Sequence, residues 1–195
     1  MILRRLKQET RADHDRIERA LDLVQLCRSV EAYRRLLERY LGFYAPVEAA
    51  LGRLEALASL GVDLERRRKA GLLERDLAAL GLSERDLAAL PRCMDLPDLT
   101  SATRALGCMY VLEGATLGGQ IIARQLLPAL GLSAAAGGSF FSSYGASVGP
   151  MWRAFGERLV ACATTPEAEA EIVAGARQAF GSFTRWVLLA APSSL

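Results

Sequence analysis

The sequence contains a single histidine, and its position on a predicted helix makes it the first candidate for chemistry. His14 belongs to a series with spacings of three and four, which is the period of one helix face. The imidazole therefore falls on the inward-facing line of that helix. Any metal coordination or acid–base chemistry that needs imidazole has only this candidate. The series consists of Leu3, Leu6, Thr10, His14, Ile17, Leu21 and Val24.

Two charged neighbours give His14 a geometry. Lys7 lies seven residues upstream on nearly the same face, two turns or about 10 Å away along the helix. Glu18 lies one turn downstream, within side-chain reach of His14. A cation two turns from an imidazole suits a ligand with a metal at its centre and anionic groups at its edge, such as a porphyrin with propionates. A histidine without a chemical role is the alternative that this spacing leaves open.

A second informative segment runs from Tyr110 to Ile122, where helical patterning continues across Gly114, Gly118 and Gly119. Each glycine weakens a helix by about 1 kcal/mol relative to alanine. A helix tolerates this where it bends or where a flat ligand approaches the backbone. Gly114 and Gly118 are one turn apart and open the same face. A turn between two helices and close helix packing are the alternatives; a phosphate-binding loop is excluded because no strand precedes it.

Composition restricts the classes of function. The chain has 195 residues and is expected to form one domain over residues 1–195, with a frayed tail at 190–195. A net charge of +2 argues against a nucleic-acid surface, and the short run Arg66-Arg67-Arg68-Lys69 is interpreted as a solvated helix face. No apolar run of membrane-spanning length and no secretory h-region are seen. Four scattered cysteines form no zinc motif, and the expected location is a reducing cytoplasm.

The elements that must position these residues are all predicted helices. A ten-residue echo within 62–90, separated by Gly81, predicts two short helices, the second capped by Ser83. Thr100 or Ser101 can cap the glycine-bearing helix. The absence of strand patterning predicts an all-α, single-domain helical bundle. Expected helices cover 2–27, 30–60 with a kink at Pro46 and an end at Gly61, 102 onward, 150–162 and 166–189, with a connector at 91–97 and a loop at 137–149.

Together, the two motifs resemble the haem oxygenase family, in particular the bacterial biliverdin-producing branch associated with bacteriophytochromes. Residues 6–18 look like the family's proximal helix, with a lysine seven before the iron-binding histidine and a glutamate four after it. Residues 110–120 look like the distal helix with its G-x-x-x-G-G-Q motif, and the interval of about a hundred residues also fits. Thr165-Pro166 followed by Ala179-Phe180 is a weaker third match.

The resemblance implies a role for each matching residue. Haem b would lie between the N-terminal proximal helix and a glycine-kinked distal helix. His14 would bind the iron, with Glu18 near its other ring nitrogen, while Lys7 and Tyr110 would hold propionates. Gly114, Gly118 and Gly119 would let the distal helix close over the porphyrin, so that their backbone atoms and water bond the iron-bound dioxygen. Phe180 would line the pocket.

The implied reaction is oxidative cleavage of haem to biliverdin, carbon monoxide and iron, with dioxygen and electrons from an external ferredoxin or NADPH-dependent reductase. A bacteriophytochrome is the implied recipient of the biliverdin. Many family members carry aspartate after the first distal glycine, where this chain has Ala115. Ala115 keeps open a haem-binding protein that stores or senses haem without cleaving it. A helical interaction module in which His14 is incidental is the third hypothesis.

Overall fold

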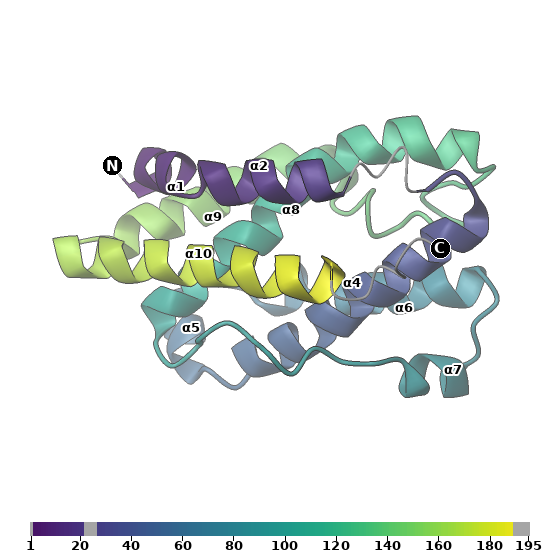
Figure 1. Ribbon diagram of the computed structural model, residues 1–195. Coiled ribbons are helices and arrows are strands. Elements are labelled where there is room, and N and C mark those ends of the chain that lie inside the picture. Colours follow the sequence, from purple (N-terminus) through teal and green to yellow (C-terminus); the bar gives the residue numbers. More distant parts are fainter. Residues whose placement is uncertain (1, 22–26, 189–195) are drawn as a thin grey trace.

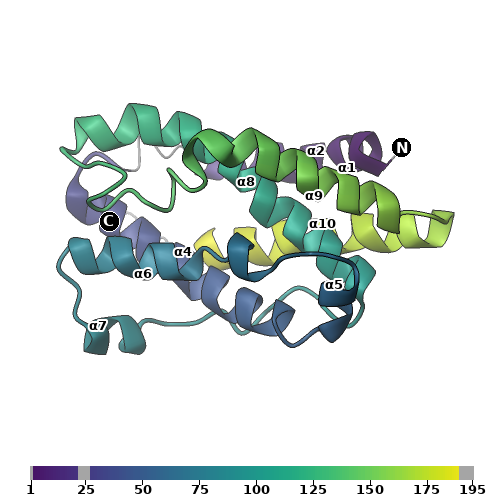
Figure 2. The same ribbon diagram turned by 180° about the vertical axis from the view of Figure 1, so that it is seen from behind.

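The computed structural model describes residues 2–21 and 27–188, and the regular structure in these ranges is helical, without strands (Figures 1 and 2). The prediction of an all-α fold is confirmed. The expected frayed tail at 190–195 lies outside the described residues. The helices are α1 (Ile2–Glu9), α2 (Arg11–Ala20), α4 (Val30–Leu51), α5 (Glu55–Ser59), α6 (Ala70–Ala79), α7 (Glu84–Ala89), α8 (Ala102–Ala129), α9 (Val148–Cys162) and α10 (Pro166–Leu188), with 3-10 turns η1 (Glu65–Arg67) and η2 (Gly145–Ser147).

The N-terminal helix predicted over 2–27 is divided at Thr10 into α1 and α2, so the expectation of one regular helix was wrong at this residue. The Thr10 hydroxyl donates to the Leu6 carbonyl at 2.7 Å, a side-chain bond that bends helices. The backbone ladder still crosses the break, because the Thr10 N–H bonds Leu6 and the His14 N–H bonds Thr10. Helix α2 ends at Ala20, and the described residues Leu21 and Cys27 are not helical, so the predicted end at residue 27 was wrong. Val24 lies outside the described residues.

The second predicted helix, 30–60, is α4 followed by the separate α5. The Ser29 hydroxyl caps α4 by accepting from the Ala32 N–H at 3.1 Å. The helix continues through Pro46 and ends at Leu51, so the prediction was wrong for the residues between Leu51 and α5. Gly61, with φ of +70°, ends the segment as predicted.

The echo within 62–90 forms two short helices, α6 and α7, as predicted. Gly81 between them has φ of +95°, which favours glycine. Ser83 caps α7 in a capping box, in which its hydroxyl accepts from the Asp86 N–H and the Asp86 carboxylate accepts from the Ser83 N–H.

The longest helix, α8, crosses α10 with almost no space between the two backbones. A Cβ on Gly107 would lie 1.9 Å from the Ile172 carbonyl oxygen, and one on Gly175 would lie 2.1 Å from the Arg104 carbonyl oxygen. Only glycine fits at such an approach. Arg104 also binds Glu171 on α10, with Nε 2.6 Å from Oε2. The crossing fixes the first half of α8 firmly in the fold.

The loop predicted at 137–149 connects α8 to α9, although α9 begins earlier than expected, at Val148. The buried Asp76 carboxylate on α6 anchors this loop. It accepts from the Ser139 N–H at 2.8 Å, the Ser139 hydroxyl at 2.6 Å and the Phe140 N–H at 2.7 Å. A buried carboxylate with three donors is satisfied, and here it holds the loop against the bundle.

Aromatic rings join this loop to α4 and α10 in the core. Tyr44 packs edge-on against Phe140 with ring centroids 5.2 Å apart, and Phe183 lies 5.2 Å from Tyr40 and 5.0 Å from Phe43. Edge-to-face pairs of this kind contribute about 0.5–1.5 kcal/mol beyond their buried area. The loop is therefore part of the core rather than a loose connection.

Within the described residues, α8 is long and apolar enough to pass a membrane-span test by length and composition. Half of its most apolar window is buried inside the protein. The first part of α8 passes through the middle of the bundle and its later part lies along the upper edge in both views (Figures 1 and 2), so the buried part accounts for much of its apolar character.

Candidate functional site

His14 departs from the pattern of its own helix face. Leu6, Thr10 and Ile17 on this face are buried, at 0%, 3% and 8% exposure, but the His14 side chain is 54% exposed. Its Nδ1 lies 3.4 Å from Oε2 of Glu18, the residue that the sequence paired with it. The other ring nitrogen, Nε2, is therefore the atom that His14 offers to a ligand. His14 is therefore an exposed imidazole beside a buried stripe.

Helix α8 contacts the N-terminal end of α2 one turn before His14. The half-buried Tyr110 of α8 shares a side-chain hydrogen bond with Thr10, and burial raises the pKa of the Tyr110 hydroxyl. The Tyr110 ring packs on Trp152 of α9, with centroids 5.6 Å apart. Figure 1 shows α2 lying in front of α8. This contact brings the predicted proximal and distal helices together.

Helix α10 packs beside His14. The Phe180 ring, 7% exposed, lies edge-on to the imidazole of His14 with ring centroids 6.1 Å apart. Arg177, one turn earlier, lies 3.8 Å from the Asp13 carboxylate. The structure thus brings the sequence-predicted His14, Glu18 and Phe180 together. Lys7 is exposed on α1, and no contact joins it to the other predicted residues.

The glycines of α8 differ in what surrounds them. A Cβ on Gly118 would meet nothing within 4 Å, and one on Gly114 would only touch the Trp152 ring at 3.8 Å. Leu117 and Ile121 on the same side are 39% and 59% exposed. This part of α8 therefore presents a flat, apolar, open face, defined by Gly114, Leu117, Gly118 and Ile121 and called the glycine face below. Such a face suits a planar apolar ligand.

Gly119 has a different neighbour, because a Cβ there would lie 3.1 Å from the Phe141 carbonyl oxygen of the 139–147 loop. Its lack of a side chain allows that loop to pack closely on α8. Helix α8 is unbroken through the glycines, so the alternative of a turn at Gly118-Gly119 was wrong. The alternative of close packing through small residues is confirmed for Gly119, which packs on the loop. Gly118 instead faces open space.

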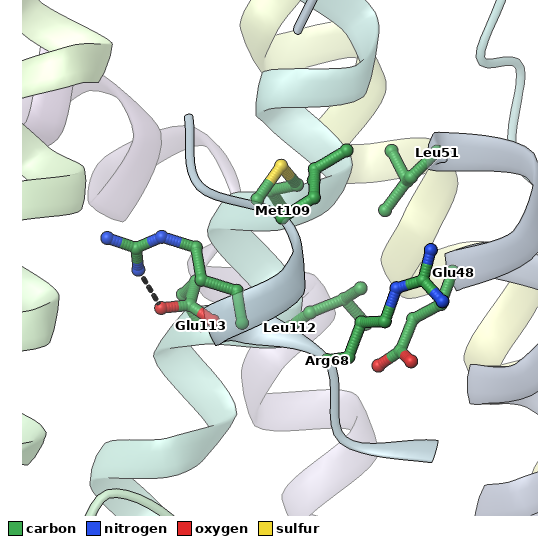
Figure 3. Close-up of a pocket in the computed structure, with 8 residues that line it drawn as sticks. Glu48, Leu51, Arg68, Met109, Leu112 and Glu113 are labelled. Carbon is green, nitrogen blue, oxygen red and sulfur yellow. Dashed lines mark hydrogen bonds and ion pairs between the residues drawn. The ribbon is translucent and has the colours of Figure 1, made fainter. Parts of the chain in front are cut away.

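The basic run at 66–69 was predicted to be a solvated helix face, and for two of its residues this was wrong. The side chains of Arg67 and Lys69 are only 9% and 3% exposed. Both bind the buried Glu113 of α8, which is labelled in Figure 3: Arg67 through Oε2, and Lys69 through Oε1 at 2.6 Å. Arg67 and Lys69 can be buried because buried charges need partners and the Glu113 carboxylate is theirs. Glu113 is over forty residues away in the chain, so the run itself does not show this partner.

Two cavities flank this buried ion-pair cluster. The first has a volume of about 20 Å³ and lies between η1, α4 and α8 (Figure 3). It is lined by Glu48, Leu51, Leu64, Arg67, Arg68, Met109, Leu112 and Glu113. The second, about 10 Å³, is lined by Lys69, Ala115, Gly119, Phe140 and Phe141 among others. Neither is lined by His14. The sequence analysis did not predict this cluster. Glu113, an acidic residue inside an apolar helix, could have indicated a buried ion pair.

Comparisons with known proteins agree with this geometry. The family model for haem oxygenase matches residues 1–188. A solved structure, that of the NO- and CO-bound haem oxygenase from Neisseria meningitidis, is similar with a TM-score of 0.77 and 28% sequence identity, covering 100% of this chain and 95% of the other. No curated protein matches the chain.

The helical fold is thus similar to that of a solved haem oxygenase, and the family match is more specific. The chain belongs to the haem oxygenase family. The family assignment and the fold predicted from the two motifs are confirmed. The domain limits at 1–195 and the roles of the individual site residues stay predictions.

Proposed function

We propose that this protein is a haem oxygenase that cleaves haem to biliverdin, carbon monoxide and ferrous iron, using dioxygen and electrons from a ferredoxin or an NADPH-dependent reductase. The observation that carries the proposal is the exposure of the His14 side chain on an otherwise buried stripe; the exposed glycine face of α8 is the second surface that the proposal uses. An exposed imidazole and a flat apolar face are the two surfaces that a haem needs. The family membership of the chain supports the same reaction.

In this proposal, the residues of α1 and α2 bind and orient the substrate. His14 binds the iron through Nε2, and Glu18 orients the ring from Nδ1, which lies 3.4 Å from its carboxylate. Lys7 and Tyr110 hold the propionates, and Phe180 limits the pocket beside the imidazole. Bound haem supplies the iron at which dioxygen is activated.

The glycine face acts on the opposite side. Gly114 and Gly118 would allow the porphyrin to approach the α8 backbone closely, so that main-chain groups of this helix would supply hydrogen bonds where haem uses dioxygen. Gly119 contributes by letting the 139–147 loop support the helix from behind. The apolar side chains of Leu117 and Ile121 exclude water from the ring.

A hemin titration tests the proposal. The wild-type protein should form a complex with a Soret band, and His14→Ala should lose or alter it while remaining folded by circular dichroism. Addition of ascorbate, or of ferredoxin and its reductase, should then produce biliverdin absorbance. Unchanged spectra in His14→Ala would exclude the ligand role and favour the interaction module.

The second candidate function is haem binding or sensing without cleavage, and Ala115 is the observation that favours it. This residue is exposed and apolar where many family members have an acid. A stable ferrous-oxy or ferric complex that yields no biliverdin would support this candidate. A Soret band together with turnover would exclude it.

The destination of the product is also part of the proposal. Similarity of the two motifs to the bacteriophytochrome-associated branch supports a cytoplasmic enzyme that supplies biliverdin as a chromophore. Mixing the purified product with a bacteriophytochrome apoprotein should generate its red absorbance band. Failure of assembly, with an authentic biliverdin control that succeeds, would argue against this role.

A further inference from the structure

The buried residue Glu113 immediately precedes the glycine face. Its side chain is 2% exposed, and its two oxygens are bound from three sides. Oε1 accepts from Lys69 Nζ at 2.6 Å and from the Tyr144 hydroxyl at 3.0 Å, while Oε2 accepts from Arg67. These contacts tie one side of α8 to η1, to the start of α6 and to the loop before α9.

Tyr144 reaches Glu113 only because its backbone adopts an unusual conformation. Its φ of +64° is the single positive value among the non-glycine residues that the structure describes. A bulky residue in this region costs about 1–3 kcal/mol and persists only where its surroundings require it. The hydroxyl is also bonded by Lys69 Nζ at 3.2 Å, and the ammonium lies 4.9 Å from the ring centroid. The strain is offset by these contacts.

Lys69 is itself placed by its surroundings. The Glu48 carboxylate accepts from the backbone N–H of Lys69 at 2.7 Å and from that of Ala70 at 3.2 Å. The ammonium has a third acceptor in the Arg67 carbonyl at 2.8 Å. All three donors of Lys69 are thus engaged, so the cation cannot move without breaking several bonds.

We propose that Lys69, Glu113 and Tyr144 form a positioning network that sets the angle at which the glycine face of α8 lies over the bound haem. The inference rests on the proposed function. One helix position corresponds to a rotation of about 100°, so fixing the Glu113 side chain fixes the direction in which Gly114 faces. The Thr116 hydroxyl donates to the Glu113 carbonyl at 2.7 Å, a bond that bends a helix at the same place.

The network holds the helix on one side only, which is why its effect is directional. On another side of the helix Gly118 faces open space, because a Cβ there would meet nothing within 4 Å. Loss of the network should leave the helix folded, because the crossing at Gly107 and Gly175 holds its first half. It should instead loosen residues 113–119 and change which ring edge of the haem lies closest to the backbone.

The test compares Tyr144→Phe with Tyr33→Phe as a matched control. Each variant removes one phenolic hydroxyl and keeps the ring. Tyr33 is fully buried and donates to the Gly137 carbonyl at 2.9 Å, so its hydroxyl also holds the segment after α8 but does not touch Glu113. A general loss of stability should therefore appear in both variants. Glu113→Gln, which keeps the shape and removes the charge, is the second test variant.

Two measurements distinguish positioning from stability. In the haem-free protein, amide hydrogen exchange of a peptide covering 113–120 should accelerate about tenfold in Tyr144→Phe and Glu113→Gln, as expected for loss of a hydrogen bond to a charged group, and not in Tyr33→Phe. In the hemin complex, the two test variants should change the ratio of biliverdin isomers and the pH midpoint of the ferric haem spectrum. The control should retain the wild-type values.

Equal behaviour of Tyr144→Phe and Tyr33→Phe in both measurements would overturn the inference. The proposed function fails separately, if the wild-type protein binds no hemin. The exchange experiment needs no haem and therefore still decides whether the network restrains the glycine face of α8.

Discussion

Replacing Gly118 by alanine tests the glycine face of α8, because the expected effects on folding and on ligand binding have opposite signs. A Cβ at this position meets nothing within 4 Å, so the methyl group fits without strain. Alanine within a helix is more favourable than glycine by about 0.8–1 kcal/mol. We therefore expect the haem-free variant to be more stable by that amount, measured as a shift of the urea midpoint at unchanged m value.

Binding of hemin should become weaker in the same variant. A planar ligand in contact with the backbone at Gly118 would have to move away from an added methyl group. An extra methyl in a packed site typically costs about 1–3 kcal/mol, which corresponds to a roughly 5- to 150-fold higher Kd. A Soret titration of wild-type and variant protein measures this change directly.

Gly71→Ala is the matched control. A Cβ on Gly71 also meets nothing within 4 Å, but this residue lies in the first turn of α6, which packs on α4 rather than on α2. Its variant should gain stability and keep the wild-type Kd for hemin. If Gly118→Ala were stabilised and bound hemin with unchanged affinity and spectrum, the glycine face would not be a wall of the haem site.

Three further predictions concern the bundle itself. Gly107→Ala should lower the free energy of unfolding by at least about 2–3 kcal/mol, or prevent folding, because its Cβ would lie 1.9 Å from the Ile172 carbonyl oxygen; chemical denaturation measures the change, and wild-type stability would contradict the close crossing. Glu113→Ala should cost about 3–5 kcal/mol, since it leaves two buried cations without their carboxylate, and a loss below 1 kcal/mol would show that the cluster is solvated. Burial raises the pKa of every tyrosine, so the stability linked to the neutral phenols is complete below the unfolded pKa of about 10 and is lost as the pH rises above it. Ultraviolet titration should show no tyrosinate before alkaline unfolding. Ionisation near pH 10 in the folded state would contradict this burial. The five residues are Tyr33, Tyr40, Tyr44, Tyr110 and Tyr144.

Periodicity and local capping predicted most of the fold because they depend on neighbours in the chain. Ser83 and Gly81 are recognisable from their own type and position, and the structure gives them the expected conformations. The break at Thr10 was harder to predict, since this residue fits the helical period. Its hydroxyl bonds the Leu6 carbonyl, and the helix is divided there. The prediction of one helix over 30–60 was wrong after Leu51 because helical periodicity does not show where a chain turns.

The site could be predicted only where its residues form local motifs. The pairing of His14 with Glu18 is a one-turn contact, and the structure shows it. The exposure of His14 on a buried stripe could not be predicted, because it depends on how α2, α8 and α10 meet. The same holds for Lys69, whose partner Glu113 is distant in sequence: a charged run indicates a solvated surface unless the opposing carboxylate is known.

The crossing of α8 and α10 at Gly107 and Gly175 has a mechanical consequence. With carbonyl oxygens against the missing side chains, neither helix can slide along the other without a backbone collision. We therefore expect a change in the distance between α8 and His14 to occur as a tilt of the second half of α8 about this crossing. The residues beyond Gly114 are farther from the crossing, so a small tilt there produces a larger displacement at Ile121.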